Sequence, residues 1–125
     1  MPKHWLSIKR RNHQVALLLS AIFGLGIGYF TLTPNPNYLL TSSDKLAHLL
    51  GFAFLLVPAA LLYRHALYWI LPCAIAFGGV IEIIQPYVNR NGEWGDFLAD
   101  AIGAILGVSA GLLLRYVFRK RFTVE

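Results

Sequence analysis

Charged residues are scarce in this chain. Only 14% of its 125 residues are Asp, Glu, Lys or Arg, whereas 57% are hydrophobic. About 25% of the residues in an ordinary soluble domain are charged, so this composition argues against a soluble domain. The net charge of +5 would suit nucleic-acid binding, but such a surface gathers its basic residues on one solvated face. Here the basic residues flank apolar segments, so we expect a membrane protein and no nucleic-acid partner.

Cysteine and the common catalytic motifs are also nearly missing. The one cysteine, Cys73, excludes an internal disulfide. It lies about halfway along an apolar segment and away from the polar residues, which disfavours a thiol nucleophile. The sequence contains no HExxH zinc motif, no nucleotide-binding glycine loop and no GxSxG elbow. It also shows no repeat, low-complexity tract or second domain, so we treat residues 1–125 as one domain.

Four long apolar segments dominate the chain: residues 15–33, 46–63, 66–84 and 97–118. Each is close to the roughly 20 residues that a helix needs to cross a hydrocarbon core of about 30 Å. The helices of a soluble bundle would carry polar residues throughout, whereas residues 52–63 and 73–81 contain almost none. We therefore predict an all-α, four-helix transmembrane bundle.

The first segment also resembles a signal peptide, because it combines a basic start with an apolar run. The run from residue 15 to 33 is longer than an ordinary signal core. We therefore expect it to be a retained span.

The basic residues predict the orientation. Nine of the eleven lie on one side of the predicted spans: Lys3, Lys9, Arg10, Arg11, Arg64, Arg115, Arg119, Lys120 and Arg121. Only Lys45 and Arg90 lie on the other side. Because Lys and Arg favour the cytoplasmic side, we expect both termini in the cytoplasm.

Acidic residues gather on the opposite, outer side. Five of the six lie there: Asp44, Glu82, Glu93, Asp96 and Asp100. At 1.5 Å per residue, His48, Glu82 and Asp100 each lie roughly 5 Å inside the outer boundary of their own helix. An ionisable group at the bilayer centre costs about 2.5–3.5 kcal/mol, so such groups usually face the protein interior and find partners. We predict that these three side chains line an outward-facing polar pocket.

Small residues support this inward placement. Gly103, Gly107 and Gly111 recur at every fourth position of the last segment and form a ridge that lets another helix approach closely. Gly78 precedes Glu82 by one helical turn. The polar faces and the packing faces are therefore expected to coincide.

Glu82 is the main candidate for proton transfer. A partly buried carboxyl group suits general acid or base chemistry, whereas a carboxylate paired with Arg90 or Lys45 would be structural. His48 is a candidate proton shuttle or metal ligand, or else a packed, hydrogen-bonded residue. Together with Asp100, these two residues are the catalytic candidates.

The same three residues have side chains of the types that bind zinc or manganese. Their spacing in the sequence does not demand a metal ion. The sequence therefore predicts no metal site and no cofactor.

Five further residues are candidates for substrate binding: Asp44, Lys45, Gln85, Arg90 and Asp96. The planar guanidinium group of Arg90 can grip phosphate or carboxylate, or it forms a loop ion pair with Asp96 or Glu93. Lys45 holds an anionic headgroup in one interpretation and extends to the lipid headgroups in the other. Asp96 is also a candidate N-cap of the fourth helix. Gln85 orients Glu82 or a substrate, or it only provides hydrogen bonds to the backbone at the end of its own helix.

An ordered set of motifs covers most of the chain: Asp44-Lys45-x-x-His48, Glu82-x-x-Gln85, Arg90 six residues before Asp96, and Asp96-x-x-x-Asp100-x-x-Gly103-x-x-x-Gly107. From Ser43 to Arg115 this set resembles the VanZ-like family of small bacterial integral membrane proteins. The chain departs from the family pattern at Asp100, where Asn is more frequent, and at Phe52, where Tyr is common.

The resemblance implies a multi-pass protein of the bacterial cytoplasmic membrane. The family takes its name from a member associated with resistance to the glycopeptide teicoplanin. We expect the pocket to bind or modify a lipid-linked cell-envelope molecule, with membrane lipids as further partners. A non-enzymatic accessory protein and a purely structural polar network are the alternatives. Whether the chain is an enzyme, and whether it acts as a monomer or a homo-oligomer, stays open at this point.

Overall fold

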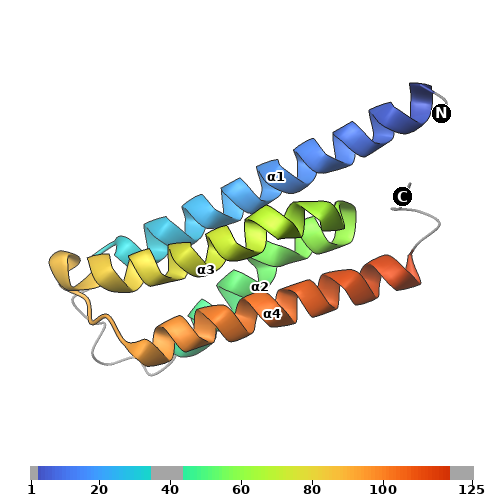
Figure 1. Cartoon of the computed structure of the whole chain (residues 1–125). Helices are drawn as coiled ribbons and strands as arrows, with labels where there is room; N and C mark the ends of the chain where they lie inside the picture. The colour runs from blue at the N-terminus through green and yellow to red at the C-terminus, as the bar shows by residue number, and fades with distance from the viewer. Residues whose placement is uncertain (1–2, 35–43, 119–125) are drawn as a thin grey trace.

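The computed structural model describes residues 3–34 and 44–118, without the side chain of Asp44. These residues form four long helices: α1 (Lys3–Leu32), α2 (Asp44–Leu62), α3 (Leu67–Ile84) and α4 (Trp94–Val117). Two short 3-10 helices, η2 (Arg64–Ala66) and η3 (Gln85–Val88), flank α3 (Figure 1). All four long helices have the length and composition to cross a membrane. The prediction of an all-α protein with four helices long and apolar enough to cross a membrane is thus confirmed.

Three helices lie close to their predicted ranges, but α1 begins at Lys3, well before the predicted start at residue 15. The physical reason is that Lys, Arg and Gln are good helix formers, so a helix can continue beyond its apolar part. α1 begins and α4 ends at the same end of the bundle (Figure 1). We call the opposite end, where α1 and α3 end and α2 and α4 begin, the polar end.

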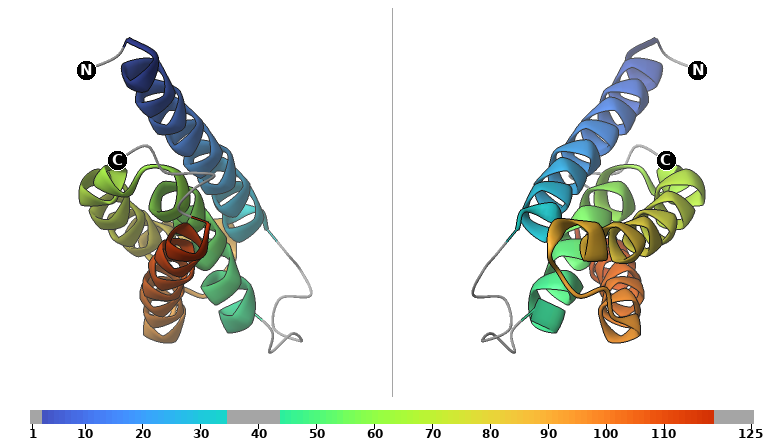
Figure 2. Two further views of the ribbon diagram at one scale, coloured as in Figure 1. Left: turned by 90° about the vertical axis from the view of Figure 1, so that its right-hand side faces the viewer. Right: turned by 90° about the vertical axis from the view of Figure 1, so that its left-hand side faces the viewer.

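The bundle is built around α2, which packs against both α1 and α4 (Figure 2). Phe52, Leu56, Ala59 and Ala60 of α2 have no exposed surface. Pro58 interrupts the hydrogen bonds of this helix. In the preceding turn, the Ser20 hydroxyl of α1 donates to the Leu55 carbonyl over 3.1 Å.

Glycines let α4 pack directly against the backbone of α2. A Cβ atom at Gly103 would overlap the Leu49 carbonyl oxygen, and one at Gly107 would overlap the Ala53 carbonyl oxygen. At Gly111 a Cβ atom would lie 2.5 Å from the Cβ atom of Ala60. The predicted small-residue ridge is therefore confirmed, and α2 is the helix that it contacts.

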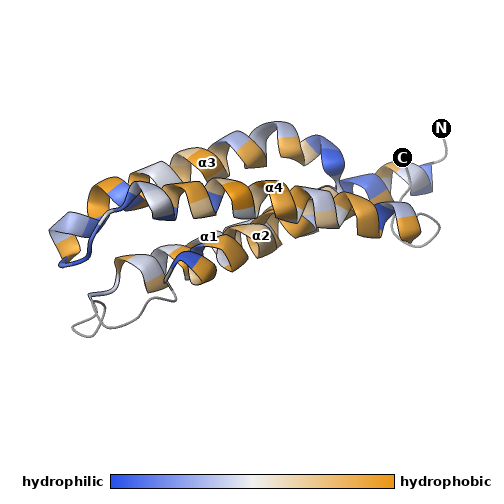
Figure 3. Cartoon of the chain, turned by 90° about the horizontal axis from the view of Figure 1, so that it is seen from below, coloured by the Kyte–Doolittle hydropathy of each residue, from blue (hydrophilic) through white to orange (hydrophobic). Residues whose placement is uncertain are grey.

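Hydrophobic residues predominate along the middle of the helices, and hydrophilic residues gather towards the ends (Figure 3). Large aromatic side chains are exposed near both ends: Tyr68 and Trp69 at the start of α3, and Tyr87 and Trp94 at the polar end. Tyr and Trp favour the two interfaces of a bilayer. This distribution fits a bundle that spans a membrane.

A carbonyl group at the end of α2 accepts a hydrogen bond from a buried arginine of α4. Arg115 Nη1 donates to the Leu61 carbonyl over 3.2 Å, and the residue is 7% exposed. The last carbonyls of a helix have no partner within that helix. Arg115 therefore binds two helices together instead of lying only in the aqueous phase.

We predict that Gly107→Ala lowers the free energy of unfolding by about 1–3 kcal/mol, because the added methyl group overpacks the α2–α4 contact. Gly26→Ala is the matched control, since a Cβ atom there would meet nothing within 4 Å. Its stability should be unchanged or slightly raised. Unfolding in mixed detergent micelles measures both variants, and equal losses would contradict the packing described here.

Candidate functional site

Polar side chains from three helices meet at the polar end. His48 lies near the start of α2, Glu82 near the end of α3 and Asp100 near the start of α4. His48 Nδ1 is 2.7 Å from Asp100 Oδ1 and 4.0 Å from Glu82 Oε1. The side chains of His48 and Asp100 are 1% exposed, and that of Glu82 is 12% exposed. We call these three residues the polar cluster.

The glycines place Asp100 inside the bundle. A Cβ atom at Gly78 of α3 would lie 2.8 Å from Asp100 Oδ2. Gly103 lies about one turn further along α4 and contacts the backbone of α2 at Leu49. Asp100 is thus held between α2 and α3, where its carboxylate reaches His48.

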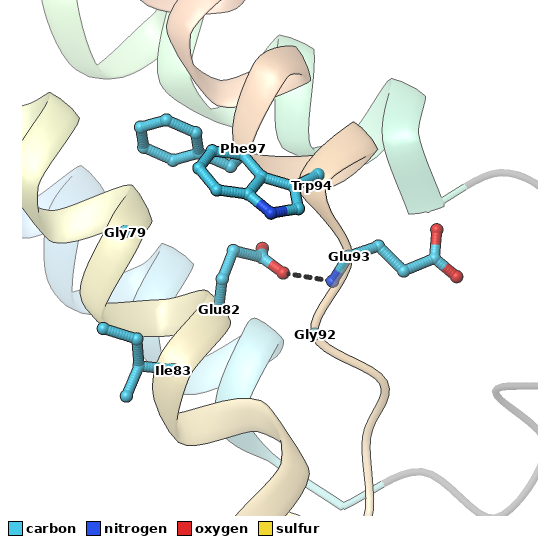
Figure 4. Close-up of a pocket in the computed structure, with 7 residues that line it drawn as sticks. All are labelled: Gly79, Glu82, Ile83, Gly92, Glu93, Trp94 and Phe97. Carbon is cyan, nitrogen blue, oxygen red and sulfur yellow. Dashed lines mark hydrogen bonds between the residues drawn. The ribbon is translucent and has the colours of Figure 1, made fainter.

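The loop before α4 holds Glu82. The backbone N–H of Glu93 donates to Glu82 Oε2 over 2.8 Å (Figure 4). The loop can pass so closely because residue 92 is glycine: a Cβ atom there would overlap the Glu82 carbonyl oxygen. Glu82 Oε1 is buried and has no hydrogen-bond partner among the described residues. One carboxylate oxygen is therefore fixed by the loop while the other lies on the His48 side.

Two cavities adjoin the polar cluster. A cavity of about 350 Å³ lies beside Glu82 and is walled by α3, α4 and the loop before α4, with Trp94 and Phe97 among its lining residues (Figure 4). A second cavity of about 360 Å³ lies between α1 and α2. Its lining is mainly apolar, but it includes His48 and Arg90. The cluster therefore contributes polar groups to both cavities.

Lys45 bridges two acidic residues at the exposed edge of the polar end, which we call the rim. Its Nζ atom is 2.7 Å from Glu93 Oε2 and 3.3 Å from Asp96 Oδ1. The side chain of Lys45 is 57% exposed, whereas that of Asp96 is 1% exposed. Lys45 thus places a cation at the polar end that is still accessible from outside.

The predicted N-cap role of Asp96 is wrong. α4 begins at Trp94, so Glu93 occupies the N-cap position, without a side-chain cap hydrogen bond. Asp96 lies in the first helical turn, where a negative charge still suits the helix dipole. The helix starts earlier than predicted because the backbone N–H groups of Asp96 and Phe97 both donate to the Glu93 carbonyl, over 3.0 and 3.3 Å, and so close the first turn there.

Gln85 and Arg90 reach across to the end of α1. Arg90 Nη1 donates to the carbonyls of Thr33 and Phe30 over 3.1 and 3.4 Å. Gln85 Nε2 donates to the Thr31 carbonyl over 3.2 Å, and both residues are buried. Because a helix end in an apolar environment needs partners for its carbonyls, these two residues attach α1 to η3 and to the loop that follows it.

The structure therefore brings together all three catalytic candidates. It places Gln85, Arg90 and Asp96 in buried positions around them and Lys45 at the rim. The side chain of Asp44 lies outside the described residues. The catalytic and substrate-binding roles of these residues stay predictions.

Gly92, Trp94 and Phe97 line the cavity beside Glu82 but were not among the candidate residues predicted from the sequence. Their position next to the acidic residues of the fourth segment is the signal that links them to the site.

Comparisons with family models, with curated proteins and with solved structures found no match. The resemblance to the VanZ-like family therefore rests on the quoted motifs alone. Any function of the polar cluster has to be inferred from its geometry and its chemical groups.

Arg90→Met keeps an apolar side chain of similar length but removes the donors to the end of α1. We expect the free energy of unfolding to fall by about 1–3 kcal/mol, the typical cost of leaving a buried polar group unsatisfied. Arg64→Met, at an exposed position in η2, should change it by no more than about 0.5 kcal/mol. Thermal unfolding in detergent compares the two variants, and equal stability would show that Arg90 does not support α1.

Proposed function

We propose that this chain is a VanZ-like protein of the bacterial cytoplasmic membrane that binds or modifies a lipid-linked cell-envelope molecule. Both termini face the cytoplasm, as the excess of basic residues on their side of the spans indicates. The polar end then faces outward. The observation that carries the proposal is the convergence of His48, Glu82 and Asp100 beside a cavity.

The cavity beside Glu82 has a volume and lining that suit a small amphipathic group. Its volume of about 350 Å³ falls within the usual range of about 300–1,000 Å³ for ligand sites. Trp94 and Phe97 provide apolar walls, and Glu82 provides a carboxylate. A molecule with a polar headgroup and an apolar tail would place these two parts against the matching walls.

Proton exchange is the chemistry that fits the polar cluster. Asp100 accepts a hydrogen bond from Nδ1 of His48 when that nitrogen carries the proton, which fixes the ring orientation. Glu82 Oε1 lies 4.0 Å from the same nitrogen, so a small shift or one water molecule would connect the two groups. In this scheme the imidazolium form of His48 gives its Nδ1 proton to Glu82 Oε1 and keeps its Nε2 proton, and Asp100 orients the ring while Nδ1 is protonated.

Lys45 is the cation best placed to meet an anionic headgroup, because its side chain is 57% exposed at the rim. A charge-assisted hydrogen bond to a phosphate or carboxylate would draw the headgroup towards Glu82. Arg90 is buried and donates to the end of α1, so its headgroup role stays a prediction.

A structural network is the second candidate function. It is favoured by the bonds that Gln85 and Arg90 make to α1 and by the bridge from Lys45 to Glu93 and Asp96. In that case the polar groups tie the helix ends together and no ligand is required.

Glu82→Gln separates the two candidates, because it preserves the shape of the side chain but removes its charge. We expect native mass spectrometry to find a discrete envelope lipid on the wild-type protein extracted from its own membranes. The lipid should be lost from Glu82→Gln, with the amount of folded protein unchanged, and it should be retained by Glu125→Gln, the same substitution at the last residue of the chain.

Two results would count against a ligand-binding pocket. One is equal lipid retention by Glu82→Gln and the wild type. The other is a complete lack of bound lipid together with a lower melting temperature of Glu82→Gln, which would favour the structural network.

A further inference from the structure

The polar cluster has the composition of a metal site as well as of a proton relay. His48, Glu82 and Asp100 come from three different helices, and one ligand atom from each lies within 4.8 Å of the other two. Imidazole nitrogen and carboxylate oxygen are common ligands of zinc and manganese. We infer that these three side chains bind one divalent transition-metal ion, zinc or manganese.

The distances allow such an ion after small side-chain movements. Bond lengths of about 2.0–2.2 Å in a tetrahedral site place the ligand atoms roughly 3.4 Å apart. His48 Nδ1 is 2.7 Å from Asp100 Oδ1 and 4.0 Å from Glu82 Oε1. These values lie on both sides of the required separation. An ion would take the place of the proton between His48 and Asp100 and would draw Glu82 closer, so binding should release a proton.

The charges of the cluster favour a divalent cation. Glu82 and Asp100 together carry two negative charges when both are ionised. Their side chains are only 12% and 1% exposed. Buried charges need compensation by an opposite charge or a metal ion. A divalent ion would neutralise both carboxylates at once.

The surroundings already orient one ligand. The Glu93 backbone N–H fixes Glu82 Oε2 over 2.8 Å and leaves Glu82 Oε1 on the His48 side. Glu82 Oε1 is buried without a hydrogen-bond partner among the described residues. Hydrogen bonds of this kind position ligands in known metal sites. Three protein ligands also leave a coordination position for water or for an oxygen of a ligand.

This inference rests on the proposed function only in that both use the same pocket, and its test needs no lipid. The full-length protein is purified in detergent, stripped with a chelator and titrated separately with Zn²⁺, Mn²⁺ and Mg²⁺. We expect Zn²⁺ or Mn²⁺ to bind with one ion per chain. Mg²⁺ should bind far more weakly, because it prefers sites made of oxygen ligands.

Variants identify the ligands. His48→Gln should weaken the binding by at least about 100-fold, more than the 10–100-fold that is typical for the loss of an outer-shell partner. His65→Gln is the matched control, because His65 lies in η2 at the other end of α2 and α3. Asp100→Asn still accepts a hydrogen bond from His48 and should therefore fold. Its affinity should fall at least about tenfold, even if His48→Gln is too unstable to purify.

Pulsed electron paramagnetic resonance of the Mn²⁺-loaded wild type provides a direct readout. We expect a hyperfine coupling to one ¹⁴N nucleus that His65→Gln retains and His48→Gln loses. Absence of binding above the detergent background, or equal binding by His48→Gln and His65→Gln, would overturn the metal site. So would full affinity of Asp100→Asn.

Native mass spectrometry of the same samples separates the two hypotheses. One bound metal ion without any lipid would uphold the metal site while the proposed lipid function fails. A specific lipid on protein that binds no metal ion would overturn the metal site and leave the lipid function standing.

Discussion

In a bilayer, a polar group that leaves water must find a partner within the protein. This constraint accounts for several long-range polar contacts among the described residues. Arg90 and Gln85 bind the last carbonyls of α1, Arg115 binds the end of α2, and Ser20 binds a carbonyl of α2 in the turn before Pro58. Each of these bonds joins two elements that are far apart in the sequence, so satisfying the backbone also fixes the arrangement of the helices.

The glycine ridge of α4 sets the position of the candidate site. Gly103 and Gly107 rest on carbonyl groups of α2, and Gly78 leaves room for the carboxylate of Asp100. If α4 stood farther from α2, Asp100 would not reach His48 at 2.7 Å. The chemistry proposed for the pocket therefore depends on contacts made by residues that have no side chain.

Much of this arrangement follows from the sequence because a helix converts residue spacing into depth. The common depth of His48, Glu82 and Asp100 and the four-residue period of the glycines are both properties of single helices. The attachment of α1 could not be predicted in the same way. Its acceptors are the carbonyls of Phe30, Thr31 and Thr33, and every residue has a carbonyl, so no side-chain pattern marks them. The early start of α4, which removes Asp96 from the cap position, depends on the loop around Glu93 and not on hydrophobicity.

The two buried arginines also bear on the membrane around the protein. A lysine or arginine near a helix end usually bends towards the headgroups when the bilayer thickness changes. Arg90 at one end of the bundle and Arg115 at the other are bound to helix carbonyls, so such bending would break those bonds. These internal hydrogen bonds therefore fix the hydrophobic thickness of the bundle. A bilayer of different thickness must deform around the bundle, or the whole bundle must tilt.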